Sequence, residues 1–567
     1  MKIRLNWSEE RRSQISILLT ILALLALSHS ILFARFEIGY WGLINGLPIT
    51  FFVGLALLTI ASAILWASKE KHGKLLCLQL LILILALALV PLITGGSSPF
   101  VTTLYSPYRS LGYVDYIVRQ AHFDTQVTFY LGWPGAFILP AMIANIGLID
   151  FAPVIEVLLP FLLILFFLPL YIFLKNTLGE NRSNYIWAGC WLFYLANWAG
   201  PGILTSAPGI AAFFLLVILA LVTNPRIWQK DGKSLVILSL IVIVFAAMVA
   251  SHLLTSLVAL GIMAALSLVR LDKRLALTTT VCLVILLAWN LTVAGDYVLP
   301  RIPFISGGEL TLGGKFTFNL GAFIGREVTG TLLGSGSPVD IARVKLLHGV
   351  LFALIGLAGL ISSLIMRKEL KTTISLLAIT VAPLPLIILS GFYASEMLNR
   401  VYAFVLPGMA YFGARLFDTN KRVVATVLCL LLFLIIPLNL IATYGNAERD
   451  YFSPGQRQGM FFFHEKTSQG LVFGAKPIGQ FKNIEHHANI RLDRLLKWKD
   501  SRLASPKLMR QYLPYFIGIS RQDRALYGWF LGETNFIPEM EQRLQDAVSW
   551  DFIYNNPDLK LYIYEGE

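Results

Sequence analysis

Residues 232–270 read GKSLVILSLIVIVFAAMVASHLLTSLVALGIMAALSLVR, and Lys233 and Arg270 are the only Lys, Arg, Asp or Glu residues in this stretch. A helix needs about 20 predominantly apolar residues to cross a hydrocarbon core of about 30 Å. The polar pair Ser251-His252 divides the stretch into two runs of nearly that length. The stretch therefore predicts two membrane-spanning helices joined by a very short turn.

The composition of the whole chain agrees with this hairpin. Of the 567 residues, 56% are hydrophobic and 14% are charged, and the mean hydropathy is +0.69. Soluble domains usually carry about 25% charged residues. These values exclude a cytosolic enzyme, a disordered scaffold and a nucleic-acid-binding protein, although the formal net charge is +13. The basic excess is therefore interpreted first as membrane topology.

Comparable apolar runs recur along the chain and predict a polytopic α-helical membrane protein with about 13 transmembrane helices, within a range of 12 to 14. The predicted spans are 14–35, 48–67, 75–95, 155–175, 185–201, 207–223, 234–250, 254–270, 275–293, 345–366, 372–391, 400–417 and 423–443. The apolar stretch 134–149 is shorter and rich in Pro and Gly. It is either a re-entrant segment or a fourteenth crossing, and we favour the re-entrant segment.

The charges of the short loops predict the sidedness. Lys and Arg gather in alternate segments of the chain, whereas the short loops 36–47, 202–206 and 251–253 contain none. The basic segments lie near residues 2–12, 69–74, 175–182, 226–233, 270–274, 367–371 and 415–422. Because basic loops stay in the cytoplasm, the N-terminus is predicted to be cytoplasmic. An odd number of spans then predicts an extracytoplasmic C-terminus.

The predicted domains are a polytopic transmembrane domain over residues 1–443, with outer loops 96–134 and 294–343, and an extracytoplasmic soluble α/β domain over residues 444–567. The C-terminal part contains 16 Lys or Arg and 15 Asp or Glu, as expected for a soluble domain. It contains a strand-like run at 471–475, a helix-like stretch at 490–498 and a hairpin pattern over 552–564. The four cysteines lie singly in apolar runs, so neither a disulfide framework nor a zinc site is indicated.

The first outer loop contains an amphipathic helix pattern over residues 105–124, as in a helix that lies in the membrane interface. Asp115, Arg119 and His122 are spaced so that they share one face of that helix. This face offers a general base or a metal ligand. Alternatively, Asp115 and Arg119 form a solvated pair worth about 0.2–0.5 kcal/mol. Asp124, at the end of the stretch, is an equally good carboxylate candidate.

Four further outer residues are candidates for contact with a sugar or an acceptor. Tyr130 and Trp133 either form a wall that stacks on a sugar or belong to an interfacial aromatic belt. His252 lies at membrane depth, where an ionisable side chain is a functional-site hypothesis. Alternatively, it satisfies the backbone at the break between the two runs. Glu396 is the last of these candidates, at the outer start of the span 400–417.

Arginine side chains at the outer ends are candidates for a phosphate ligand. The guanidinium group of Arg400 can bind a phosphate bidentately, or it can pair with Glu396 or reach the lipid headgroups. Arg326 in the second outer loop and Arg109 in the helix-like stretch 105–124 are further candidates for the same role.

This layout resembles the GT-C superfamily of membrane glycosyltransferases, which includes the oligosaccharyltransferases and the protein mannosyltransferase-like group. Two stretches carry the resemblance. One is the first outer loop with residues 130–135, Tyr-Leu-Gly-Trp-Pro-Gly. The other is Asn-Arg-Val-Tyr at 399–402, which is similar to the run that contacts the lipid-linked donor in this family. Family members place an acidic residue early in the loop, whereas residues 104–107 contain none. The acidic role then falls to Asp115 or Asp124, or transferase chemistry has been lost.

The resemblance implies an integral membrane protein of the plasma or inner membrane that transfers a sugar or oligosaccharide from a polyprenyl-phosphate carrier to an acceptor glycan or protein on the outer face. It implies membrane lipid as a partner and no nucleic acid. The cofactor is left open, with a divalent cation, Mg²⁺ or Mn²⁺, as one option. The alternatives are a surface-polysaccharide polymerase or ligase, a non-catalytic assembly protein, and a lipid or solute transporter. The transporter is disfavoured because the predicted spans contain few polar residues besides His29 and Asn290.

Overall fold

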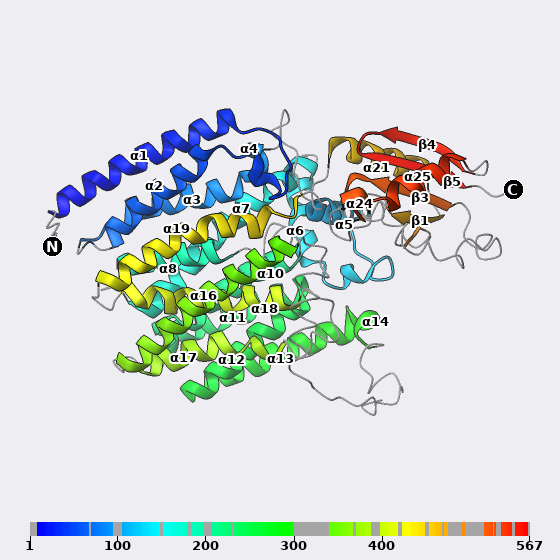
Figure 1. Ribbon diagram of the computed structural model, residues 1–567. Coiled ribbons are helices and arrows are strands. Elements are labelled where there is room, and N and C mark those ends of the chain that lie inside the picture. The colour runs from blue at the N-terminus through cyan, green and yellow to red at the C-terminus, as the bar shows by residue number, and fades with distance from the viewer. Residues whose placement is uncertain are drawn as a thin grey trace, which may run out of the picture.

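The structure is a computed structural model. It describes residues 8–66, 68, 70–94, 105–147, 151–179, 183–197, 207–229, 231–299, 339–366, 370–386, 397–417, 422–447, 453–467, 470–474, 490–493, 515–525, 527–528, 534–546 and 550–564. Most of these residues are helical, and the long helices run side by side in one bundle (Figure 1).

The helices of the bundle follow the apolar runs of the sequence. They are α1 (Glu9–Phe33), α2 (Ile49–Trp66), α3 (Gly73–Ala88), α7 (Phe151–Leu178), α8 (Ser183–Ala196), α10 (Ala207–Val222), α11 (Gly232–Ser251), α12 (Leu253–Arg270), α13 (Lys273–Thr292), α16 (Val339–Met366), α17 (Leu370–Val381), α18 (Met397–Leu416) and α19 (Arg422–Tyr444). Each predicted span overlaps one of them. The predicted span 75–95 is interrupted at Leu89. α3 ends at Ala88, and α4 (Val90–Thr94) continues around Pro91, which lacks an N–H to donate.

Length and hydropathy confirm the membrane class. Within the described ranges, eight helices are long and apolar enough to cross a membrane, and four shorter apolar helices accompany them. The chain is therefore a polytopic α-helical membrane protein. The number of 13 crossings and the cytoplasmic position of the N-terminus stay predictions.

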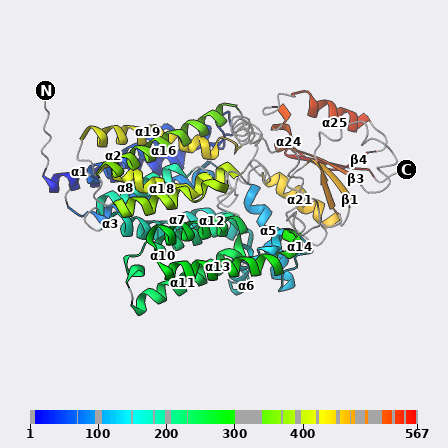
Figure 2. The same ribbon diagram turned by 90° about the horizontal axis from the view of Figure 1, so that it is seen from below.

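A small mixed sheet lies at one end of this bundle, which is called the sheet end below (Figures 1 and 2). The strands are β1 (Gly470–Gly474), β2 (Ile490–Asp493), β3 (Tyr515–Ser520), β4 (Asp551–Asn556) and β5 (Leu559–Tyr564), in the order β2-β1-β3-β5-β4. The predicted strand at 471–475 and the hairpin are confirmed. The predicted helix at 490–498 is wrong in its first part, because residues 490–493 pair in parallel with β1.

One apolar cluster joins the sheet to two helices at the sheet end, α5 (Tyr105–Gln120) and α6 (Gly135–Gly147). α21 (Pro454–Lys466) takes part in it between α19 and the sheet. The buried members of this cluster are Tyr113, Val114, Tyr116, Leu131, Phe137, Ala141, Ala144, Met460, Phe463, Phe516, Leu559 and Leu561. Burial of this many apolar side chains holds the C-terminal domain against α5.

The helix α6 has an unusual distribution of apolar residues. It buries mainly small side chains, such as Ala141 and Ala144, and exposes the larger Leu139, Met142 and Ile146. Its 13 residues are too few to cross a hydrocarbon core of about 30 Å. An exposed face of large apolar residues on a membrane protein is suited to contact with lipid. This geometry agrees with a segment embedded in one leaflet, and the re-entrant interpretation of residues 134–149 stays a prediction.

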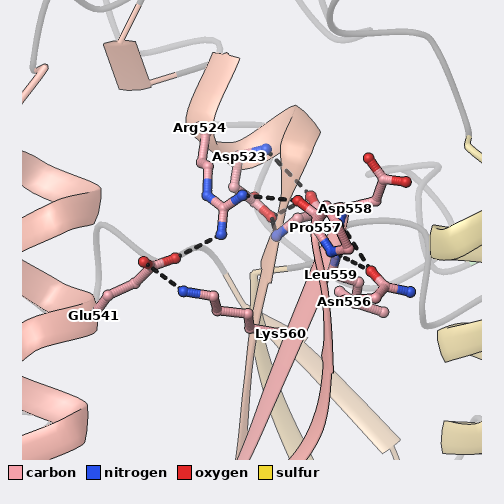
Figure 3. A network of polar contacts seen from close by, with 9 residues as sticks. Asp523, Arg524, Glu541, Asn556, Pro557, Asp558, Leu559 and Lys560 are labelled. Atoms are coloured by element: carbon pink, nitrogen blue, oxygen red, sulfur yellow. Dashed lines mark hydrogen bonds and ion pairs between the residues drawn. The ribbon is translucent and has the colours of Figure 1, made fainter.

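The C-terminal domain contains a charged network around Glu541 on α25 (Phe536–Asp546) (Figure 3). Arg524 Nη2 on α24 (Arg521–Ala525) donates to Glu541 Oε1 at 2.8 Å, and Lys560 Nζ on β5 donates to Oε2 at 2.9 Å. Burial raises the pKa of Glu541, but these hydrogen bonds and charges outweigh burial, so the pKa lies below its ordinary value. The carboxylate therefore ties α25 to the sheet in its ionised form.

We expect the Glu541 contribution to stability to depend on pH. Because the folded-state pKa is lowered, the contribution is fully present above the unfolded pKa of about 4.3 and is lost as the pH falls through the lower folded value. For a partly exposed pair the expected contribution is about 0.2–1 kcal/mol. Hydrogen exchange of residues 536–546 in the full chain, corrected for intrinsic rates, should show Glu541→Gln less protected than wild type at pH 7.

At strongly acidic pH, wild type and Glu541→Gln should show the same hydrogen-exchange protection of residues 536–546, because Glu541 is then protonated in the wild type. Glu539→Gln is the matched control, because Glu539 is exposed on the same helix. A difference between wild type and Glu541→Gln that persists unchanged in acid would contradict the ionised network.

Candidate functional site

His252 forms the whole connection between α11 and α12 at the sheet end. Its Nδ1 lies 2.8 Å from Thr255 Oγ1 and 3.3 Å from the backbone N of Thr255. In the tautomer with Nδ1 unprotonated, the side chain accepts the Thr255 N–H and caps the N-terminus of α12, where backbone N–H groups have no helical partner. The interpretation of His252 as a residue that satisfies the backbone at the break is therefore supported by its geometry.

The second ring nitrogen of His252 faces Arg400. Arg400 lies in the first turn of α18, and its Nη1 is 3.5 Å from His252 Nε2. Burial, and after it the charge of Arg400, lower the pKa of His252 to about 3. The imidazole is therefore neutral at physiological pH, so Arg400 is the cation of the pair. The predicted sugar contact His252 and the predicted phosphate ligand Arg400 meet at one place.

The segment 130–135 reaches the same turn. A Cβ atom built on Gly135 would lie only 2.7 Å from Ser251 Oγ, so only glycine allows α6 to begin this close to the end of α11. Trp289 Nε1 at the end of α13 donates to Gly132 O at 2.9 Å. These contacts hold residues 132–135 beside Ser251, the neighbour of His252.

The two aromatic candidates of this segment pack in different directions. The Trp133 ring meets Tyr297 edge-on with centroids 5.6 Å apart, and its Nε1 is buried without a hydrogen-bond partner among the described residues. The Tyr130 ring lies 5.3 Å from Tyr113 and packs against the apolar cluster of the C-terminal domain. Tyr130 therefore connects this segment to α5.

The predicted shared face of the interface helix forms only in part. Arg119 Nε donates to Asp115 Oδ2 at 2.9 Å, which is the predicted i,i+4 pair. The helix was expected to continue to residue 124, but α5 ends at Gln120 because Ala121 adopts a left-handed backbone with φ of 56°. His122 therefore leaves the helix, and its Nδ1 lies 2.9 Å from Gln120 O. The expectation that His122 shares the helix face of Asp115 is wrong.

Asp124 lies in a turn that contacts a distant acidic residue. Its Oδ1 accepts the backbone N–H of Gln126 at 2.8 Å, and Gln126 Nε2 donates to Asp296 Oδ2 at 2.7 Å. Thr125 Oγ1 also donates to Asp296 at 3.4 Å. Asp296 lies on α14 (Gly295–Val298), directly after α13. Nothing in the sequence pattern links Gln126 to Asp296, which lies 170 positions away.

Three predicted site residues cannot be placed. Arg326 and Glu396 lie outside the described residues, and Arg109 lies on α5 with a side chain outside them. Among the described candidates, Arg400 and His252 are in contact and residues 132–135 lie beside Ser251, whereas Asp124 lies in the turn that meets Asp296 on α14.

Buried polar residues inside the spans are more frequent than the sequence suggested. Gln79 on α3 bonds to Ser16, Thr20 and Ser62, and at the end of α8 both His348 and Asn439 donate to Leu195 O at 2.9 and 2.8 Å. The expectation that the spans contain few polar residues besides His29 and Asn290 is therefore wrong. Because these side chains bind backbone and one another between helices, they serve helix packing.

A metal ion needs several oxygen, nitrogen or sulfur ligands together. Across the described ranges, no three His, Cys, Asp or Glu side chains are close enough to hold one. Asp296 on α14 is hydrogen-bonded by Thr125 and Gln126 of the turn that contains Asp124, and no third ligand among the described residues joins the two carboxylates. The described residues by themselves therefore do not form a metal site.

The bundle with its interface helix and C-terminal domain has the fold of the GT-C membrane glycosyltransferases. The oligosaccharyltransferase of Archaeoglobus fulgidus, solved with zinc and sulfate, matches with a TM-score of 0.52 at 13% identity, over 86% of this chain and 72% of that chain. Its apo form matches with a TM-score of 0.51 at 13% identity, over 82% and 72%. ArnT of Cupriavidus metallidurans in the apo state gives 0.49 at 10% identity, over 87% and 98%.

No protein-family model matches the chain, and no curated protein sequence matches it. The GT-C resemblance predicted from the sequence is confirmed for the fold. At this identity the likeness concerns the fold alone, so the activity has to be argued from the site.

Proposed function

We propose that this protein is a membrane glycosyltransferase that moves a sugar or oligosaccharide from a polyprenyl-phosphate carrier to an acceptor. The observation that supports this most directly is the position of Arg400. It lies in the first turn of α18 at the sheet end, beside a neutral histidine, in a bundle with the GT-C fold. A guanidinium group there can bind a phosphate at headgroup level.

The sheet end corresponds to the outer face in this proposal. The basic loops predict that His252 and the start of α18 lie on the side opposite the cytoplasm. A donor on a lipid carrier would enter from the membrane with its phosphate at Arg400. The C-terminal domain, packed on α5, would hold the acceptor.

Arg400 has a defined role in the proposed reaction. Transfer breaks the bond between the sugar and the carrier phosphate, so negative charge develops on that phosphate as it leaves. A cation aligned beforehand stabilises such charge more in the transition state than in the ground state.

A carboxylate would accept the proton of the acceptor. Asp124 suits this role better than Asp115, because Asp115 is engaged by Arg119 at 2.9 Å. Asp124 uses Oδ1 for its turn, and no described residue hydrogen-bonds to its Oδ2. Arg326, Arg109 and Glu396 stay proposed contacts of the donor or acceptor, as does a divalent cation as cofactor.

The proposed function is tested by mass spectrometry of polyprenyl-linked glycans in membranes of the host organism. Deleting the gene should cause one carrier-linked glycan to accumulate, since its consumer is gone, and the mass of that glycan identifies the sugar. Restoring the wild-type gene should return it to its former level. If every carrier-linked glycan is unchanged by the deletion, the transferase proposal is contradicted.

A further inference from the structure

The side chain of His252 is held at both ring nitrogens. Nδ1 contacts Thr255 Oγ1 at 2.8 Å, and Nε2 lies 3.5 Å from Arg400 Nη1. Thr255 is fully buried in α12. The ring is therefore placed between a rigid helix start and the guanidinium group of Arg400.

The chemistry of arginine decides which nitrogen carries the proton. A guanidinium group has only donors, so the contact with Arg400 is favourable only when Nε2 is unprotonated. A neutral imidazole then carries its proton on Nδ1 and donates to Thr255 Oγ1 at 2.8 Å. A protonated Nδ1 cannot also accept the backbone N–H of Thr255 3.3 Å away, so in this tautomer His252 gives up the cap of α12. The opposite tautomer would direct Nε2–H against a guanidinium N–H. The lowered pKa of His252 agrees with a ring that stays neutral.

The backbone below Arg400 is fixed independently. Tyr402 Oη, two residues further along α18, donates to Ala196 O at the end of α8 at 2.9 Å. The start of α18 is thus anchored to its neighbour, and the long side chain of Arg400 determines where its guanidinium group lies. When a long side chain becomes ordered only as the ligand binds, the lost conformational entropy weakens binding. A side chain that is already ordered does not carry this cost.

We infer that His252 is a positioning residue, which accepts a hydrogen bond from Arg400 and holds its guanidinium group ready for the phosphate of a lipid carrier. This inference rests on the proposed function, because that function makes Arg400 the phosphate ligand. It replaces the expectation that His252 contacts the sugar or acceptor itself. In this arrangement Thr255 Oγ1 accepts the hydrogen bond from Nδ1–H, and the unprotonated Nε2 faces Arg400.

Two conservative variants separate this role from helix capping. His252→Asn keeps a carbonyl oxygen near the position of Nδ1, and Asn is a good N-cap, but it leaves nothing at the position of Nε2. His252→Gln reaches the position of Nε2 with an acceptor oxygen. If His252 only caps α12, His252→Asn should preserve the wild-type properties better than His252→Gln. If His252 positions Arg400, His252→Gln should preserve phosphate binding better.

The measurement is binding of undecaprenyl phosphate to the full-length protein in nanodiscs. We expect Arg400→Ala to weaken binding by at least about tenfold, and His252→Asn by about five- to tenfold. His252→Gln should stay within about twofold of wild type. Thermal unfolding of each variant, followed in the same nanodiscs, reports on capping separately.

A double variant tests whether the two residues act together. In an Arg400→Ala background, His252→Asn should have no further effect, because the group that it positions is absent. Wild-type binding by His252→Asn, together with weak binding by Arg400→Ala, would overturn the positioning role and leave the phosphate site intact. Unchanged binding by Arg400→Ala would instead overturn the assignment of Arg400 in the proposed function.

Discussion

Replacing Arg400 with alanine is expected to slow consumption of the carrier-linked donor by about 10²–10³-fold. The expectation follows from the loss of the cation that would meet the charge developing on the leaving phosphate. Arg400→Lys keeps the charge but loses the planar fork of donors, so a smaller loss is expected. The rate is measured by a pulse of isotope-labelled sugar in the deletion strain carrying each variant, and the decay of the labelled carrier-linked glycan is followed by mass spectrometry.

Arg343→Ala is the matched control for this experiment. Arg343 also lies at the sheet end, on α16, but it is exposed and pairs with Asp340 at 3.1 Å. Its loss should leave donor consumption close to the wild-type rate, with each variant present in the membrane at the same level. Equal effects of Arg343→Ala and Arg400→Ala would show that Arg400 has no special role in transfer.

The membrane fold could be predicted because its signal is local. Each span consists of about 20 consecutive apolar residues, and the lipid core imposes that length whatever the neighbouring helices are. The short turn at Ser251-His252 was visible for the same reason, as two polar residues between apolar runs. The interruption at Leu89 was missed, because hydropathy does not respond to the backbone limits that Pro91 imposes.

The site could be predicted less well because its members come from distant parts of the chain. His252 and Arg400 were both selected as polar residues at costly positions, but their contact joins residues 148 positions apart. The link between Gln126 and Asp296 has no sequence signal at all. α5 ends because one residue, Ala121, adopts a left-handed backbone. An alanine in the sequence does not predict such a turn, whereas a glycine would.

Strand β2 shows a different limit. Residues 490–493 read Ile-Arg-Leu-Asp, which alternate as a strand does, yet the basic and apolar residues that follow favoured a helix. Pairing with β1 along the register from Gly470 to Phe473 decides the conformation, and that pairing is tertiary. Short segments next to a sheet are therefore assigned by their neighbours more than by their own propensity.

Replacing Asp124 with asparagine is expected to lower the rate of transfer by about 10²–10⁴-fold while binding of undecaprenyl phosphate stays at the wild-type level. Asn keeps the oxygen that accepts the backbone N–H of Gln126, so the turn and its contact with Asp296 should survive. Only the charge and the ability to accept a proton are removed. Asp231→Asn is the control, since Asp231 caps α11 in the same way through Ser234.

Asp115→Asn distinguishes the two carboxylates that the sequence left open. If Asp124 is the base, Asp115→Asn loses only its pair with Arg119, worth about 0.2–0.5 kcal/mol on a helix surface, and transfer continues. If Asp115→Asn stops transfer and Asp124→Asn does not, the base lies on α5 and its pair with Arg119 must open when the acceptor binds. Loss of transfer in both variants would indicate that the two carboxylates act on the same acceptor.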